Sequence, residues 1–75
     1  MNFMADYKEL FAERLKHLRS ERGLTQAKLA ELLGSKPRTM KNWEGGVNIP
    51  PVEILCKIAD YFDVSLDYLV GRDKP

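Results

Sequence analysis

The segment TQAKLAELLGSKPRTMKNWEGG, residues 25–46, decides the fold of this chain. Its first half reads as a short helix that Thr25 begins and Gly34 ends, because threonine is a good N-cap and glycine tolerates a left-handed C-terminal conformation. A second helix starts almost at once and places Met40 and Trp43 on one buried face. Two helices with so short a connection must cross steeply, so the segment predicts a helix-turn-helix arrangement.

The length and composition of the chain fit one small globular domain. The chain has 75 residues, of which 44% are hydrophobic and 31% charged, unlike a disordered tail. The single cysteine, Cys56, excludes an internal disulfide and fits a reducing cytoplasm, which is the location we expect. We find no signal peptide and no run of the ~18 apolar residues that a membrane span needs.

The charges are unevenly distributed, although the net charge is only +1. Residues 8–22 carry five Lys and Arg against three Glu, and residues 35–48 carry three bases against one Glu. Residues 51–75 reverse the balance, with five acids against three bases. This distribution gives the domain a basic front and a mildly acidic back, and the basic front suits a polyanionic partner.

The remaining segments also read as helices, because apolar residues recur with helical spacing over residues 7–22, 52–62 and 66–70. No strand candidate of useful length is present, so we predict an all-α domain of five helices with short connections. The side chains expected to face inward include Leu10, Phe11, Leu15, Leu18, Leu29, Ala30, Leu33, Ile54, Leu55, Ile58, Ala59, Phe62, Leu66 and Leu69. The expected boundaries are a loose N-terminal lead over residues 1–7, the domain over residues 8–71 and a frayed C-terminus over residues 72–75.

Three stretches of the chain resemble the Cro/phage-repressor type of helix-turn-helix protein, the xenobiotic-response-element-like transcriptional regulators. They are RLKHLRSERGLTQAKLAELLG from Arg14, TMKNWEGG from Thr39, and Pro50 together with ILCKIADYFDVSLDYLVGR from Ile54. The resemblance implies a compact lambda-repressor-like domain whose third helix, about residues 36–45, enters the major groove of double-stranded DNA. It also implies a sequence-specific regulator, expected to be a repressor that binds a palindromic operator as a homodimer.

The resemblance assigns base reading to one face of the third helix. Pro37, Arg38 and Asn42 match positions that face base edges, and Lys41 lies beside them. Arg38 could donate two hydrogen bonds to guanine, whereas Asn42 could pair with adenine or bond to a phosphate. Pro37 has no side-chain donor and can offer only shape or contact with a thymine methyl group. The alternative for Asn42 is a solvated polar side chain.

Phosphate binding is assigned to Gln26, Lys28, Lys36 and Thr39. Gln26 matches the residue that opens the second helix of the family, where it anchors to a phosphate and can brace the third helix. An amide donor and a helix N-terminus both favour an anion. A lysine is a flexible point charge, which suits a phosphate better than a base edge. The alternatives are a simple capping role for Gln26 and ordinary solvated lysines.

The start of the third helix departs from the family pattern, which commonly has a small hydroxyl residue as the cap. Lys36 stands there and cannot cap through its side chain. Pro37 fits the first helical position and favours an extended backbone at Lys36. Ser35 could supply the cap instead, if the helix starts one residue earlier.

Several other residues have structural interpretations. Glu44 resembles an acid that pairs with an arginine of the first helix in this family, which would be Arg19 here, and the pair would brace the third helix against the first. We expect Trp43 in the core and Cys56 in or near it. Ser65 is expected to cap the last helix.

Other classes of function find little support. His17 has no partner at metal-ligand spacing, and Asp60, Asp63 and Asp67 read as a solvated face, so we expect no metal, no cofactor and no enzymatic activity. We also expect no membrane contact and no small-molecule site. The alternative to DNA binding is an antitoxin-like protein-binding module of the same fold.

Overall fold

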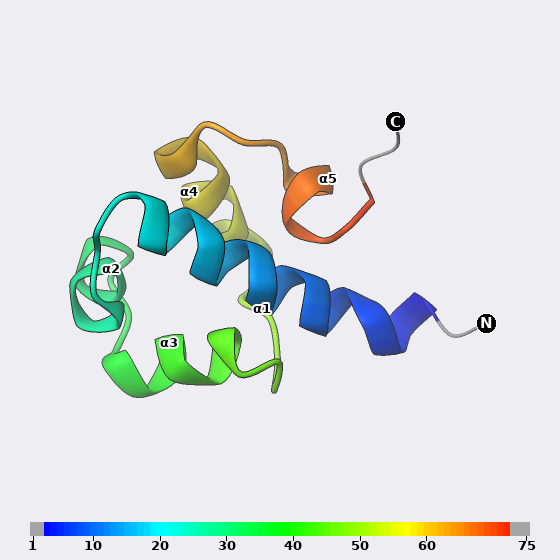
Figure 1. Ribbon diagram of the computed structural model, residues 1–75, viewed down its shortest axis with the longest axis horizontal. Coiled ribbons are helices and arrows are strands. Elements are labelled where there is room, and N and C mark those ends of the chain that lie inside the picture. The colour runs from blue at the N-terminus through cyan, green and yellow to red at the C-terminus, as the bar shows by residue number, and fades with distance from the viewer. Residues whose placement is uncertain (1–2, 73–75) are drawn as a thin grey trace.

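The computed structural model describes residues 3–72, and the side chains from Tyr7 onward. The described residues form five helices and no strand, which confirms the predicted all-α class (Figure 1). The helices are α1 (Phe3–Glu21), α2 (Gln26–Leu32), α3 (Pro37–Glu44), α4 (Val52–Phe62) and α5 (Leu66–Leu69). None of the described helices is both long and apolar enough to cross a membrane.

The N-terminal boundary differs from the prediction, because α1 begins at Phe3. The expectation of a loose lead is therefore wrong for residues 3–7, whereas residues 1 and 2 lie outside the described residues. No glycine or proline stands before the first apolar stripe, so nothing in the sequence stops the helix from extending toward the N-terminus. Of the expected frayed C-terminus, residues 73–75 also lie outside the described residues.

The first helix is the element on which the others assemble. In Figure 1, α1 crosses the middle of the molecule, with α3 on one side and α4 and α5 on the other. α3 packs against both α1 and α2, and α5 packs against both α1 and α4. This arrangement leaves the outer side of α3 open.

All five helices contribute to one core. The predicted apolar stripes of α1, α2, α3 and α4 are buried, except that Leu10 and Ile54 are only half-buried. Leu24, Ile49, Ile54, Val64 and Tyr68 pack against the core in part. The core consists of Phe11, Leu15, Leu18, Leu29, Ala30, Leu33, Met40, Trp43, Leu55, Ile58, Ala59, Phe62 and Leu69.

Two predictions about inward-facing residues are wrong. Cys56 is exposed, because Leu55, Ile58 and Phe62 define the inward face of α4 and Cys56 is turned about 100° away from Leu55. Leu66 is also exposed, whereas Leu69 is fully buried as expected. α5 has only four residues, so its single turn offers one fully inward position.

The turn between α2 and α3 is fixed by backbone hydrogen bonds around Gly34. Gly34 has a φ of 72°, the left-handed conformation that glycine adopts without a steric cost. The Ser35 amide donates to the Ala30 carbonyl oxygen at 2.7 Å, and the Gly34 amide donates to Glu31 at 3.1 Å. These bonds satisfy the last carbonyl groups of α2 and set the direction in which α3 leaves the turn.

The caps of the short helices are a testable source of stability. The Thr25 hydroxyl accepts a hydrogen bond from the Lys28 amide at 3.0 Å, as predicted. Lys36 is the N-cap of α3 without a side-chain hydrogen bond, so the alternative of a Ser35 cap is wrong. Thr25→Ala should therefore lower the free energy of unfolding by about 1 kcal/mol in urea denaturation. Thr25→Ser should restore most of it, and a Ser35→Ala loss of similar size would contradict this account.

Candidate nucleic-acid interface

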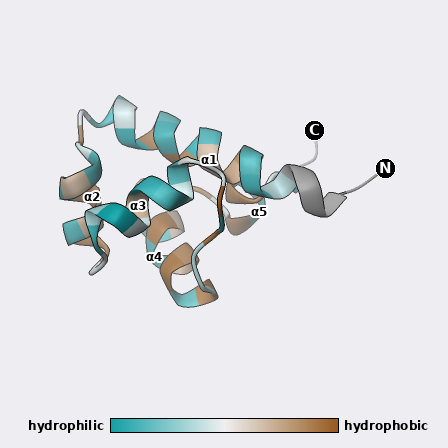
Figure 2. Cartoon of the chain, turned by 90° about the horizontal axis from the view of Figure 1, so that it is seen from below, coloured by the Kyte–Doolittle hydropathy of each residue, from teal (hydrophilic) through white to brown (hydrophobic). Residues whose placement is uncertain are grey.

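The third helix separates its side chains into a buried face and an exposed face. Met40 and Trp43 are buried and hold α3 on the core. The four predicted base-reading residues are all exposed: Pro37, Arg38, Lys41 and Asn42. Figure 2 shows that α3 is largely hydrophilic where it faces outward. The structure thus brings these four side chains together on a surface that a ligand can reach.

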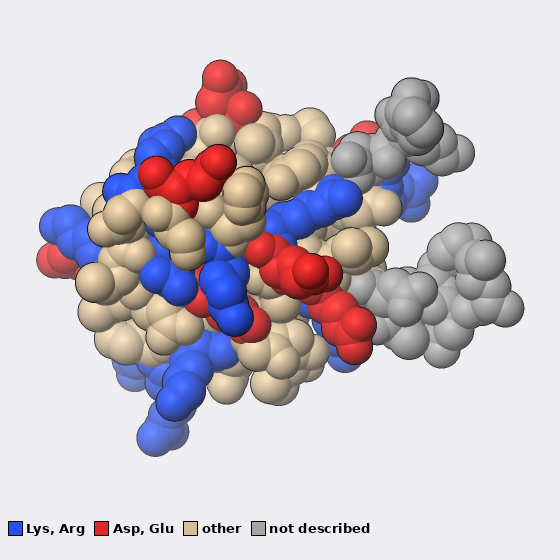
Figure 3. Space-filling model, in the orientation of Figure 1, with Lys and Arg blue, Asp and Glu red and all other residues tan. Residues whose placement is uncertain are grey.

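Basic side chains project from the part of the molecule where α2 and α3 lie. In the space-filling view, Lys and Arg extend from the lower left edge, while acidic residues are mixed with bases elsewhere on this face (Figure 3). Lys28, Lys36 and Arg38 are exposed in this region. These positive charges come from α2 and from the start of α3, and an exposed cluster of positive charge favours a polyanion.

The first turn of α3 is also suited to an anion. Pro37 occupies the first helical position, so its missing N–H removes no helical hydrogen bond. The Lys36 carbonyl accepts the first intrahelical bond, from the Met40 amide at 3.0 Å. Because no side chain caps this end, the first-turn amides and the positive end of the helix remain available to a phosphate.

A buried polar network fixes α3 to α1 and α2. Arg19 donates two hydrogen bonds to the Glu44 carboxylate, from Nε to Oε2 at 2.6 Å and from Nη2 to Oε1 at 3.0 Å. The Gln26 amide nitrogen donates to the same Oε1 at 3.0 Å. The expected Arg19–Glu44 pair is therefore present, and Gln26 braces α3 directly.

The Glu44 carboxylate of this network is shielded from water. The Glu44 side chain is 2% exposed and the Arg19 side chain 16% exposed, so the pair is far less screened than a surface pair. Arg19 also donates to the Leu24 carbonyl oxygen at 2.6 Å, which ties the end of α1 into the same network. The hydrogen bond to Glu44 raises the pKa of Arg19, against the opposing effect of burial. The guanidinium therefore stays charged at every physiological pH.

The predicted phosphate-binding residues differ in their exposure to solvent and in their ion pairs. Lys28 is exposed and lies 3.3 Å from Glu31, one turn along α2, in an exposed ion pair that contributes little to stability. Lys36 is exposed, whereas Gln26 and Thr39 are half-buried. A phosphate can reach the two lysines without displacing any buried group.

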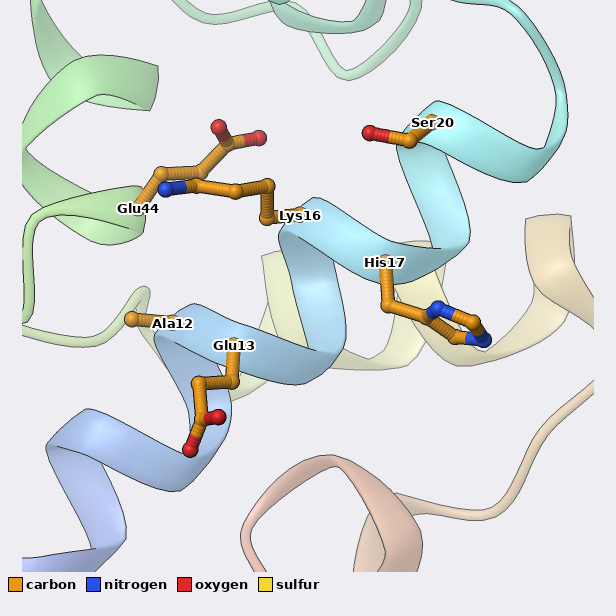
Figure 4. Close-up of a pocket in the computed structure, with 6 residues that line it drawn as sticks. All are labelled: Ala12, Glu13, Lys16, His17, Ser20 and Glu44. Atoms are coloured by element: carbon orange, nitrogen blue, oxygen red, sulfur yellow. The ribbon is translucent and has the colours of Figure 1, made fainter.

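A shallow groove of about 480 Å³ lies between α1 and the end of α3. Figure 4 shows Lys16 pointing toward Glu44, while His17 points away along α1. Arg19 and Gln26 already satisfy the Glu44 carboxylate, and His17 Nε2 lies 3.4 Å from Glu21 on the outer surface. Among the described residues no group of His, Cys, Asp and Glu could hold a metal ion. We therefore interpret the groove as the boundary along which α1 and α3 pack against each other.

Comparisons with known proteins agree with this geometry. Residues 12–72 match the family model described as "Helix-turn-helix domain". A repressor of a cryptic phage of Vibrio cholerae, RstR, is 40% identical over 80% of this chain and 54% of its own. A solution structure of the SOS-response repressor LexA from Eubacterium rectale superposes with a TM-score of 0.84 at 29% identity, covering 92% of this chain and 73% of that one. A transcriptional regulator from Listeria innocua superposes with a TM-score of 0.80 at 40% identity, covering 87% and 61%.

The chain belongs to the helix-turn-helix domain family, and it has the fold of DNA-binding transcriptional regulators. The relatives named above are two transcriptional repressors and a transcriptional regulator. The chain spans about half the length of the curated relatives that it matches.

Two contacts of the site were not predicted individually. The Lys28–Glu31 pair has the i, i+3 spacing of neighbours on one helix face, so the sequence contained a signal for it. The bond from Arg19 to the Leu24 carbonyl has no such signal, because it depends on how the chain turns after α1.

Proposed function

We propose that this chain binds double-stranded DNA in a sequence-specific manner and represses transcription, with α3 inserted into the major groove. The observation that carries the proposal is the exposure of Arg38, Lys41 and Asn42 on α3, opposite the buried Met40 and Trp43. A helix of this width fits the major groove, where each base pair presents a distinct pattern of donors and acceptors. The repressor named among the relatives supports the direction of regulation.

Base reading is proposed for the exposed face of α3. Arg38 donates to guanine O6 and N7, and Asn42, one turn further on, pairs with adenine or bonds to a phosphate. Lys41 approaches the bases from beside Asn42. Pro37 lies at the start of the helix and contributes shape or contact with a thymine methyl group.

Phosphate binding is proposed for Lys28, Lys36, Gln26 and Thr39, which surround the N-terminal ends of α2 and α3. Phosphate contacts fix the position of a protein on the duplex without reading its sequence. Because Gln26 also donates to Glu44 at 3.0 Å, a phosphate held by Gln26 would be coupled to the position of α3.

A homodimer on a palindromic operator follows from the size of the domain. A single module of this kind buries only about 600–1,000 Å² on DNA, so useful affinity normally requires two copies. The two α3 helices would then read half-sites about 34 Å apart, which is one turn of the duplex. We place this complex in the cytoplasm, where the unpaired Cys56 is expected to stay reduced.

Selection of bound sequences from a random duplex pool tests the proposal. The expected result is one enriched motif with two symmetric halves about one helical turn apart. The absence of salt-dependent binding to any duplex would refute DNA binding, whereas an enriched motif without symmetry would refute only the dimer.

The lysines should contribute affinity without specificity. Lys28→Ala and Lys36→Ala should each weaken binding to all duplexes alike and reduce the slope of log affinity against log salt by about one unit. Titrations by fluorescence anisotropy at several salt concentrations measure both quantities. Arg72→Ala removes the same charge from an exposed position just after α5, which packs against α1 and α4, and should leave the slope unchanged. A change in the selected motif for either lysine variant would mean that it reads bases.

A further inference from the structure

The proposed dimer needs a surface on which two copies meet. Apart from Leu32 on α2, which belongs to the helix-turn-helix itself, the large exposed hydrophobic residues of the described chain fall into two regions. The first contains Val47 and Val52, whose side chains are 61% and 68% exposed, the highest values among the large hydrophobic residues of the described chain. The second contains Tyr61 and Leu66, each 39% exposed, at the junction of α4 and α5. Their charge and their position relative to α3 distinguish them.

The first region begins directly at the end of α3. Residues 45–52 contain no charged side chain, in a chain of which 31% of residues are charged. Pro50 is buried and Ile49 packs against the core, so the connection is anchored in the middle while Val47 and Val52 stay outside. Figure 2 shows brown, hydrophobic stretches in this connection, together with paler ones, before the first turn of α4. A solvent-exposed apolar segment that is held rigid is suited to a protein contact.

We propose that a second copy of this chain docks on the exposed face of the first two turns of α4. We call this the α4 face and define it as Val52, Glu53, Cys56 and Lys57, with Val47 at its edge; the inference rests on the function proposed above. All four residues on α4 are exposed and share one side of the helix. A two-fold axis brings the same surface of both copies together, so each residue meets its own counterpart or a near neighbour.

The charges of the α4 face are complementary to themselves under a two-fold rotation. Glu53 and Lys57 lie one turn apart, so two antiparallel copies of α4 bring Glu53 of each copy opposite Lys57 of the other. Two copies of Val52 then bury apolar surface close to these pairs. This arrangement gives both attraction and a fixed register, which an interface of small area requires.

The second apolar region is less suited to self-association. Tyr61 and Leu66 are flanked by the exposed acids Asp60, Asp63 and Asp67, which a two-fold contact would bring close to one another. The Arg22 guanidinium also lies over the Tyr61 ring, at 5.4 Å from its centroid, so one side of that ring is already covered. Like charges facing one another oppose association.

The dimensions of the molecule fit the same conclusion. The principal extents are 35 × 23 × 22 Å, so the centres of two touching copies lie between about 22 and 35 Å apart, depending on the direction of contact, and the upper end of this range reaches the roughly 34 Å between half-sites. The α4 face follows α3 in the chain after one short connection, so the proposed contact begins close to the end of each recognition helix.

The experiment compares binding to a duplex with one half-site and to a duplex with two, for Val52→Glu and Val52→Lys. Both variants should lose about 100-fold in cooperative binding to two half-sites, because a two-fold contact contains each substitution twice. A direct electrostatic effect on DNA binding would have opposite signs for Val52→Glu and Val52→Lys. Loss of the interface would instead lower the cooperativity in both variants. Leu66→Glu is the matched control on the acidic region and should keep the cooperativity.

A charge exchange tests the register. Glu53→Lys and Lys57→Glu should each weaken the cooperativity, and the double variant Glu53→Lys/Lys57→Glu should restore it. Loss of cooperativity in Leu66→Glu but not in the Val52 variants would overturn the α4 face. Single variants that behave like the wild type would overturn the antiparallel pairing.

Cross-linking without DNA keeps the test independent of the proposed function. Cys56 is the only cysteine of the chain and lies one turn from Val52, so a short bismaleimide should join two copies of the wild type and not of Val52→Glu. Binding to a single half-site without any Cys56 cross-link or cooperativity refutes the dimer surface alone. Cross-linking without binding to any duplex refutes the DNA-binding function and retains the surface.

Discussion

Arg19→Ala should lower the free energy of unfolding by about 3 kcal/mol, because it leaves the Glu44 carboxylate buried without its counter-charge. Glu44 is 2% exposed and receives two hydrogen bonds from Arg19, so water cannot replace the lost partner without opening the seam between α1 and α3. Gln26 would remain as a neutral donor at 3.0 Å, which compensates only in part. Urea denaturation followed by circular dichroism measures the loss.

The exposed Lys28–Glu31 pair provides the control for this prediction. Glu31→Ala removes an acid from an ion pair that is open to solvent, and it should change stability by no more than about 0.5 kcal/mol. The double variant Arg19→Met/Glu44→Leu removes both charges and should recover most of the stability lost in Arg19→Ala. If the double variant is as unstable as the single one, the packing of the Arg19 stem matters more than the buried charge.

The pH dependence of the Arg19 contribution follows from the direction of its shift. Glu44 raises the pKa of Arg19, so the charged form is favoured in the folded state, and the stability from this group is lost only as pH rises through that raised value. Arginine is already protonated throughout the physiological range. We therefore expect the Arg19 guanidinium itself to add no pH dependence between about pH 6 and pH 9.

Helical periodicity and cap residues were enough to predict the architecture. The spacing of Phe11, Leu15 and Leu18 identified α1, and Thr25 and Gly34 marked the two ends of α2 as the structure has them. The errors about which residues face inward arose because the type of residue was considered and its angular position on the helix was not. Cys56 follows Leu55 directly and is turned away from the core, although its neighbours in the sequence are apolar.

The contacts within the candidate site could be predicted from the sequence less completely than the architecture. Arg19 and Glu44 are separated by 25 positions, so neither periodicity nor spacing indicates that they meet; the resemblance to a known family did. The Gln26–Glu44 hydrogen bond depends on the crossing of α2 and α3, which the turn at Gly34 sets. The roles of Arg38, Lys41 and Asn42 toward bases stay predictions, because a sequence preference depends on the DNA that faces them.

Arg38→Ala should weaken binding to the preferred duplex by about 1–3 kcal/mol, or roughly 5- to 150-fold, and should relax the preference at one base-pair position per half-site. Arg38 is exposed at the start of α3, one residue after the proline that fixes the first turn, so its guanidinium can approach a guanine edge in the plane of the base. Two parallel hydrogen bonds of that kind are lost completely in the variant. Selection from a random duplex pool, repeated with the variant, measures the change at each position.

Arg38→Lys distinguishes base reading from simple attraction to phosphate. Lysine retains the positive charge but lacks the planar pair of donors, so a base-reading role predicts that Arg38→Lys keeps the salt slope and loses most of the preference at the same position. A phosphate-binding role predicts the opposite, because Arg38→Lys would then keep the motif and nearly all of the affinity. An unchanged motif in both variants would move base recognition from Arg38 to Asn42 and Lys41, since these are the other donors on the same exposed face of α3.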